Sequence, residues 1–79
     1  MKTFVLKVAI KEEEDGRWSA VIPALPGCAS WGYSRQEALD NIRDAAEIYI
    51  EDMIEAGQGI PAATSEVEIL DEPAVAVSV

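Results

Sequence analysis

Residues 23 to 41 constrain the fold of this chain more than any other segment, because they contain the end of a strand, a turn and the start of a helix. Pro23 and Pro26 predict that a strand ends here, since proline donates no hydrogen bond to a sheet and restricts the residue before it. Gly27 supplies the backbone freedom for the turn. Cys28 then begins a short aromatic strand that extends to Tyr33.

A capping box marks the start of the helix. Ser34 is a favoured N-cap residue and Glu37 stands three positions later, so each side chain can accept a hydrogen bond from a backbone N–H group of the other. The helix is expected to run to about Ala56, with Gly57 as its left-handed C-cap. Its predicted apolar face consists of Ala38, Leu39, Ile42, Ala45, Ala46, Tyr49 and Met53.

Alternating side chains predict the strands. Residues 3 to 10 alternate between two faces, one of which holds Phe4, Leu6, Val8 and Ile10. The step from Asp15 to Gly16 favours a hairpin that returns over residues 17 to 22. Residues 74 to 79 alternate valines with small side chains and predict the last strand. Before it, turn-forming residues predict a loop over 57 to 73, with a short extended segment at 66 to 70.

The predicted order is β-β-β-α-β, which places the chain in the α+β class. A strand that follows a helix can return parallel to the first strand by a right-handed crossover. We therefore expect a mixed four-stranded sheet with the single helix packed on one face. The other face would be open, and its candidate residues are Val5, Val21, Trp31 and Tyr33.

The small size of the chain favours association. A chain of 79 residues is a single domain over residues 1 to 79, and a domain this small has a marginal core. Cys28 is the only cysteine and there is no histidine, so neither a disulfide nor a zinc site of the usual ligand set can reinforce it. A homodimer or larger homo-oligomer is therefore expected. Ile48 and Ile54 interrupt the polar pattern of the helix, either as self-association residues or as ordinary exposed isoleucines.

Negative charge is concentrated in the helix and the residues after it. The net charge of the chain is −9, of which residues 34 to 56 carry −5 and residues 1 to 33 carry none. The acids of the helix, with Asp44, Glu47 and Glu51 among them, fit two interpretations. They are either a solvated surface or an electrostatic match for a basic partner. No basic patch is present for direct binding of nucleic acid.

The sequence lacks the residue sets of an enzyme or a cofactor site. No histidine is available as a base, no glycine-rich phosphate loop is present, and Cys28 is interpreted as a small buried packing residue. Four adjacent acids, Glu12 to Asp15, favour a solvated turn over a weak cation site, so we expect no metal. No apolar run approaches a membrane span and no signal-peptide core is seen, which indicates a cytoplasmic protein.

The chain resembles the HicB-type antitoxin family. The resemblance covers essentially the whole chain and is densest over residues 18 to 55. It rests on a strand ending at Pro23, a Leu-Pro-Gly-Cys turn at residues 25 to 28, and a terminal valine strand entered through Glu72 and Pro73. Further matching positions are Gly32, Ser34, Glu37, Ala38, Asn41, Asp44 and Ala45.

The resemblance implies a partial ribonuclease H-like fold without catalytic residues. It also implies that the protein binds and covers a small basic toxin of the HicA type, a ribonuclease that cleaves mRNA. Asp44, Glu47 and Glu51 would then face the toxin, and Trp31 and Tyr33 would be either contact anchors or packing residues. The alternative is a solitary, self-associating relative without a toxin. The DNA-binding domain that many members carry has no counterpart in residues 1 to 79.

Overall fold

The computed structural model describes residues 3–58 and 73–78, and it contains one helix and five strands in these ranges. In chain order the elements are β1 (Thr3–Lys7), β2 (Ala9–Glu12), β3 (Trp18–Val21), β4 (Ala29–Gly32), α1 (Arg35–Glu55) and β5 (Ala74–Ser78). The α+β class and the single helix are therefore confirmed. The extended segment predicted at residues 66 to 70 lies outside the described residues.

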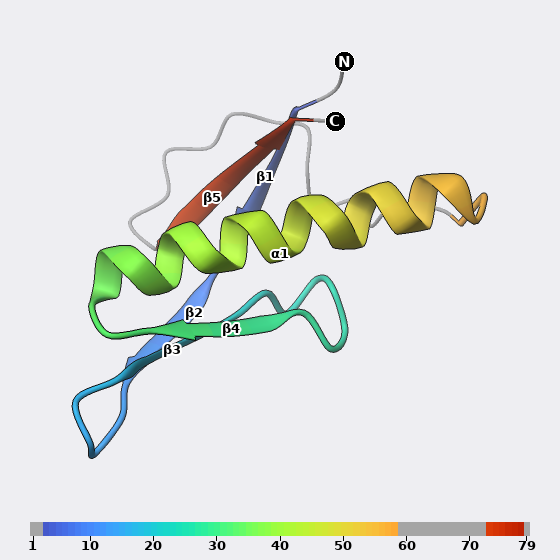
Figure 1. The fold of residues 1–79 in the computed structure, drawn as a ribbon. Coiled ribbons are helices and arrows are strands. Elements are labelled where there is room, and N and C mark those ends of the chain that lie inside the picture. Colours follow the sequence, from blue (N-terminus) through green and yellow to red (C-terminus); the bar gives the residue numbers. More distant parts are fainter. Residues whose placement is uncertain (1–2, 59–72, 79) are drawn as a thin grey trace.

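All strand pairs in the described ranges are antiparallel. β1 pairs with β5, from Thr3 opposite Ser78 to Lys7 opposite Ala74, so the two ends of the described chain lie together at one corner (Figure 1). β2, β3 and β4 form a second sheet, in that order. In this sheet Ala9 and Ala29 both lie opposite Val21 of the central strand.

The predicted mixed sheet and the parallel final strand are wrong. The crossover rule applies where a helix leads directly back into a strand of the same sheet. Here 18 residues, 56 to 73, separate α1 from β5. A chain of that length can span roughly 60 Å, whereas the 21-residue helix is only about 32 Å long. The connection is thus long enough for the chain to reverse direction before β5 begins.

The predicted strand over residues 3 to 10 is divided at Val8. Its first half pairs with β5 and its second half with β3. The Val8 N–H group donates to the Pro73 carbonyl (2.9 Å), which closes the first pairing. β3 ends at Val21 and is followed by Ile22 and Pro23. Because proline donates no ladder bond, β3 does not continue beside β1.

The loop between β3 and β4 is a pair of tight turns. Leu25 N–H donates to the Ile22 carbonyl (3.0 Å), and Cys28 N–H donates to the Leu25 carbonyl (2.9 Å). Gly27 has φ 82°, so Pro26 and Gly27 occupy the central positions of a type II turn, as their residue types favour. Leu25 is fully buried, which anchors the loop to the core.

The caps of α1 form where the sequence predicts them, except that Glu37 bonds the residue before the N-cap. Ser34 accepts from the Glu37 N–H group through its Oγ (3.0 Å). Glu37 Oε1 accepts from the N–H group of Tyr33 (3.2 Å), one residue before the N-cap. At the other end Gly57 has φ 72° and donates to the Ile54 carbonyl, while Gln58 donates to Met53. This pair of bonds is a Schellman motif.

The core lies between α1 and the inner faces of the strands. From the helix it receives Ala38, Ile42, Ala46 and Ile50, each 0 % exposed. Ile50 is missing from the predicted apolar face, although it stands four residues after Ala46. The strands and the loop after β3 contribute Phe4, Leu6, Val8, Ala20, Ile22, Leu25, Cys28, Val75 and Val77.

Gly32 sets the distance between β4 and the first turn of α1. A Cβ atom built on Gly32 would lie 2.6 Å from the Ala38 backbone nitrogen and 2.9 Å from the Glu37 backbone carbon. Both are backbone atoms, so they cannot move aside as a flexible side chain would. Glycine at this position is what lets the helix pack directly on the edge strand.

Candidate partner-binding surface

The outer face of α1 carries an acidic stripe, which we define as Asp44, Glu47, Glu51 and Glu55. All four are exposed, and their spacing of three or four residues aligns them along the helix. Within residues 3–58 and 73–78 the structure has one ion pair, Arg17–Asp15, and it lies in the β2–β3 hairpin. The three sequence-predicted acids, Asp44, Glu47 and Glu51, are therefore brought together, and no described cation forms an ion pair with them.

The charges of the stripe are unfavourable for the helix itself. Glu47, Glu51 and Glu55 follow one another at four-residue intervals, and like charges at that spacing destabilise a helix by about 0.2–0.5 kcal/mol per pair. The last turn of α1 contains no basic residue, so Glu55 lies at the negative end of the helix dipole without compensation. The stability of the helix does not explain why these acids are present.

Trp31 lies outside the core, in a small aromatic cluster with Tyr33 and Arg17. The Trp31 and Tyr33 rings meet edge to face, with centroids 5.1 Å apart and planes at 84°. The Arg17 guanidinium carbon lies 5.4 Å from the centroid of the Trp31 ring. Trp31 is 47 % exposed and Tyr33 73 %. Trp31 thus contacts both Tyr33 and Arg17 while much of its surface stays accessible.

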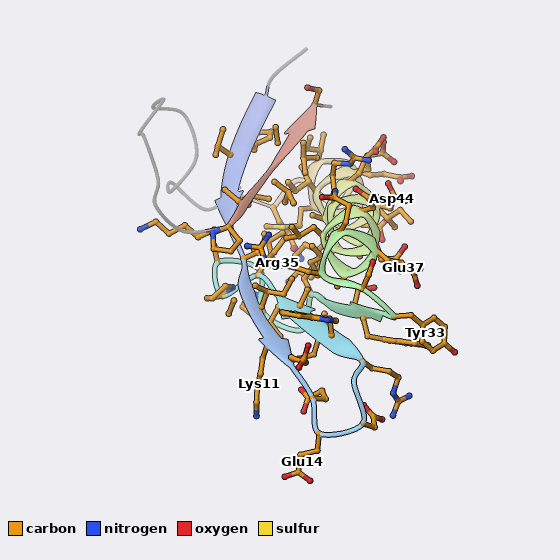
Figure 2. All side chains as sticks on the ribbon, turned by 90° about the vertical axis from the view of Figure 1, so that its left-hand side faces the viewer. Lys11, Glu14, Tyr33, Arg35, Glu37 and Asp44 are labelled. Atoms are coloured by element: carbon orange, nitrogen blue, oxygen red, sulfur yellow. The ribbon has the colours of Figure 1, made fainter. Side chains whose placement is uncertain are left out.

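Three side chains of α1 bind the backbone of β4 and its neighbouring loops. Asn41 Nδ2 donates to the Trp31 carbonyl (2.8 Å), and Glu37 accepts from Tyr33 as described above. Tyr49 donates its hydroxyl hydrogen to the Pro26 carbonyl (2.8 Å). These bonds fix the aromatic cluster relative to the helix. In Figure 2, Tyr33, Glu37 and Asp44 accordingly project on the same side of the molecule.

Ile48 and Ile54 are both exposed, at 61 % and 51 %, but they do not form one patch. Six residues along a helix correspond to about 600°, so the two side chains lie about 120° apart around the axis. Ile48 falls on the side of Asn41, which contacts β4, because seven residues separate the two. Ile54 falls on the opposite flank of the acidic stripe.

The β2–β3 hairpin is held by its own polar contacts. Asp15 accepts from Arg17 Nε (2.7 Å) and from its backbone N–H group (3.0 Å), and Ser19 Oγ donates to Glu13 (2.8 Å). The hydrogen bonds from Arg17 lower the pKa of Asp15, and the same contact raises the pKa of Arg17. Among the described residues no group of three or more acids, cysteines or histidines is arranged to hold a metal ion.

Cys28, by contrast, is buried within the turn before β4. Its side chain is 4 % exposed, and burial raises the pKa of its thiol. A raised pKa disfavours the thiolate, which is the reactive form of cysteine. The structure thus places Cys28 as a packing residue of the core.

Comparison with known proteins identifies the family of this chain. Residues 6–78 match the family model of the HicB-like antitoxin of bacterial toxin–antitoxin systems. The chain belongs to the HicB-like antitoxin family. A UPF0150 protein of Thermoplasma acidophilum is 41 % identical over 59 residues, which are 75 % of this chain and 86 % of that relative. A UPF0150 protein of Synechocystis is 43 % identical over 54 residues, 68 % of each chain.

The fold matches solved antitoxin structures. The N-terminal domain of the Burkholderia pseudomallei antitoxin HicB aligns with a TM-score of 0.68 and 26 % identity, over 99 % of this chain and 98 % of that domain. The longer structure of the same antitoxin aligns with a TM-score of 0.67. This HicB-like chain spans 64 % of that longer antitoxin.

The structure adds roles that the sequence patterns did not assign. Gly32, Asn41 and Tyr49 connect the helix to β4 and its loop, and only contacts between elements reveal their roles. Across residues 3–58 and 73–78, no helix is both long enough and apolar enough to cross a lipid bilayer.

Proposed function

We propose that this HicB-like chain is a non-enzymatic antitoxin that binds a small basic ribonuclease toxin of the HicA type and keeps it inactive by covering it. Family membership supports the antitoxin role. The observation that carries the proposal is the acidic stripe, because its charges are exposed, aligned and unfavourable for α1 itself. A basic partner would relieve that repulsion on binding. The complex would act in the cytoplasm, where mRNA is cleaved.

Asp44, Glu47 and Glu51 would attract the toxin, and Trp31 and Tyr33 would anchor it. Complementary charges accelerate encounter, whereas large aromatic side chains supply much of the energy at an interface. The aromatic cluster suits the anchor role because its rings are already ordered by mutual contact and by Arg17. Little conformational entropy would be lost when a partner covers them.

The proposal is tested by co-expression with the nearest gene that encodes a small basic protein, if the genome holds one. We expect the two proteins to co-purify and the growth arrest caused by the toxin alone to be relieved. Rescue without co-purification, or co-purification without rescue, would contradict neutralisation by direct covering.

A matched pair of charge-reversal variants locates the interface. Glu47→Lys with Glu51→Lys should slow association at least about tenfold and weaken its dependence on salt, because steering by the stripe is lost. Glu12→Lys with Glu14→Lys changes the net charge equally but lies in the exposed hairpin, so its association rate should change much less. Equal slowing by both pairs would show that net charge, not the stripe, controls association.

Self-association is a second proposal, favoured by the exposure of Val21 (42 %) and Trp31 on the outer face of the β2-β3-β4 sheet. Ile48 and Ile54 are further candidates on the helix. Light scattering over a range of concentrations would give the mass of the purified chain. A solitary homo-oligomer that ignores every basic neighbour would favour this interpretation over the antitoxin. In either case we expect no direct binding of nucleic acid.

A further inference from the structure

The outer edge of β4 holds backbone groups that face away from the sheet. Ile22 N–H donates to the Cys28 carbonyl (3.2 Å), so this pair is a hydrogen-bonded pair of the ladder. Such pairs alternate along an antiparallel ladder. The neighbouring pair, Val21 and Ala29, is therefore not hydrogen-bonded, and the N–H and C=O groups of Ala29 point to the open edge. The same alternation places the backbone groups of Trp31 on this edge.

Side chains of helix α1 bind the backbone at the far end of that edge. The Trp31 carbonyl accepts from Asn41, and the Tyr33 N–H group donates to Glu37. The N–H and C=O groups of Ala29 and the N–H group of Trp31 have no hydrogen-bond partner among residues 3–58 and 73–78. A short edge with free donors and an acceptor is a template for strand addition.

The acidic stripe lies on the same helix that borders these free groups. Asn41 and Tyr49 contact the backbone at Trp31 and Pro26, which bracket Ala29. Between the two, α1 presents Ala45, four residues from each, whose side chain is a single methyl group. On the outward side of Ala45 the helix carries Ile48 and the acidic stripe. An extended segment laid on this edge would meet acids on its helix side and Trp31 on its other side.

We propose that the partner contributes an extended basic segment that adds as a strand to the edge of β4 at Ala29. This inference rests on the proposed function and names how that partner docks. Main-chain bonds to Ala29 and Trp31 would provide affinity, and alternate side chains would provide specificity. Lysines or arginines of the segment face the acidic stripe, and its apolar side chains face Trp31.

The charge of the edge argues against a second copy of this chain as the occupant. Symmetric pairing of two β4 edges at Ala29 would bring the two copies of α1, and with them two acidic stripes, to the same side of the joined sheet. Each chain carries a net charge of −9, and like charges placed opposite one another destabilise an interface. A basic segment removes this repulsion, whereas a second copy doubles it.

The first test uses the isotope-labelled chain and a synthetic peptide. The probe is the capped hexapeptide Lys-Val-Lys-Val-Lys-Val, and its control is Glu-Val-Glu-Val-Glu-Val. We expect the basic peptide to shift the amide resonances of Ala29 and Trp31 and to slow their hydrogen exchange at least about tenfold. Shifts confined to the acidic stripe, or no binding, would overturn strand addition. Protection of Ala29 that rises with concentration of the chain alone would assign the edge to a second copy.

The second test removes one donor of the edge. Ala29→Pro deletes an N–H group that makes no bond within the described chain, and an edge strand tolerates proline where its N–H group faces outward. We expect this variant to keep its folded circular dichroism spectrum but to bind the basic peptide at least about tenfold more weakly, whereas Ala29→Ser binds normally. Undiminished binding by a folded Ala29→Pro chain would refute the proposal.

The same variants separate this inference from the proposed function. If the toxin complex loses affinity on reversal of Glu47 and Glu51 but not with Ala29→Pro, the antitoxin role holds and strand addition fails. If no basic neighbour binds at all, yet the peptide protects Ala29, the edge has the proposed chemistry and the antitoxin role fails.

Discussion

The two faces of α1 differ in burial and charge although they belong to one helix. On the inner face Ile42, Ala46 and Ile50 are completely buried, whereas on the outer face Asp44 and Ile48 are exposed. The inner residues pack against strands and stabilise the fold in proportion to the apolar area they bury. The outer acids repel one another. Stability therefore accounts for the composition of the inner face but not for that of the outer face.

Ile48 and Ile50 provide the strongest test of the difference between the two faces. Both are isoleucines, and they stand two positions apart on opposite faces of the helix. Ile50 is 0 % exposed and Ile48 is 61 % exposed. We expect Ile50→Ala to lower the free energy of unfolding by about 2–5 kcal/mol, through lost burial and the cavity left behind. Ile48→Ala should change it by no more than about 0.5 kcal/mol. Chemical denaturation of both variants measures the difference.

If Ile50→Ala does not fold, Ile50→Val provides a milder variant whose loss of stability can still be measured. It removes one methylene and should lower the free energy of unfolding by about 0.5–1.5 kcal/mol. Equal losses at positions 48 and 50 would mean that Ile48 is covered in the free chain, and the two faces would then not differ as described.

Gly32 controls where the helix sits and thus how both faces are presented. Gly32→Ala places a Cβ atom 2.6 Å from the Ala38 backbone nitrogen, so the first turn of α1 must move. We expect the free energy of unfolding to fall by about 1–3 kcal/mol, as for overpacking of a dense core. The hydrogen bonds from Asn41 and Glu37 to the backbone of Trp31 and Tyr33 should also weaken. Thermal denaturation gives the stability, and amide shifts at Trp31 and Tyr33 report the displaced contacts.

Gly16→Ala is the matched control for this glycine. Gly16 has φ 88° but open space around it, so its substitution strains only the hairpin backbone. It should destabilise the chain but leave the hydrogen bonds from Asn41 and Glu37 to the backbone of Trp31 and Tyr33 in place, so any amide shift there should be smaller than in Gly32→Ala. Identical spectral changes in both variants would remove the special role assigned to Gly32.

Local signals predicted the parts of the fold that neighbouring residues determine. The Ser34 cap, the Gly57 cap and the turn at Pro26 and Gly27 each depend on a few consecutive residues, and each forms as expected. The predicted pairing of β5 was wrong, because strand pairing depends on partners that are far apart in sequence. Local patterns cannot specify the direction in which a long connection returns the chain.

Some features of the candidate surface were predictable from the sequence, and others were not. The alignment of Asp44, Glu47 and Glu51 follows from helical spacing alone, so the sequence predicted it. Val21, Trp31 and Tyr33 were also predicted for the open face, and all three are exposed, although alternation alone does not say which face the helix covers. The free edge at Ala29 was not predicted. It requires the ladder register and the position of Asn41, which only the folded structure supplies.

The smallest effect on stability is expected for the Asp15–Arg17 pair, because it is a surface ion pair within the β2–β3 hairpin. Hydrogen bonds from Arg17 lower the pKa of Asp15 in the folded chain. A lowered folded-state pKa means that the pair stabilises the fold at pH values above the ordinary aspartate range, and that this contribution disappears as the pH falls through the folded-state value. Because both side chains are exposed to solvent, the effect on stability should be smaller than that of any substitution in the core.

A carbon-13 titration of the Asp15 carboxyl group should give a pKa below that of an unperturbed aspartate, and Arg17→Gln should return it toward the ordinary value. An Asp15 pKa that does not change with this substitution would mean that the ion pair does not form in solution.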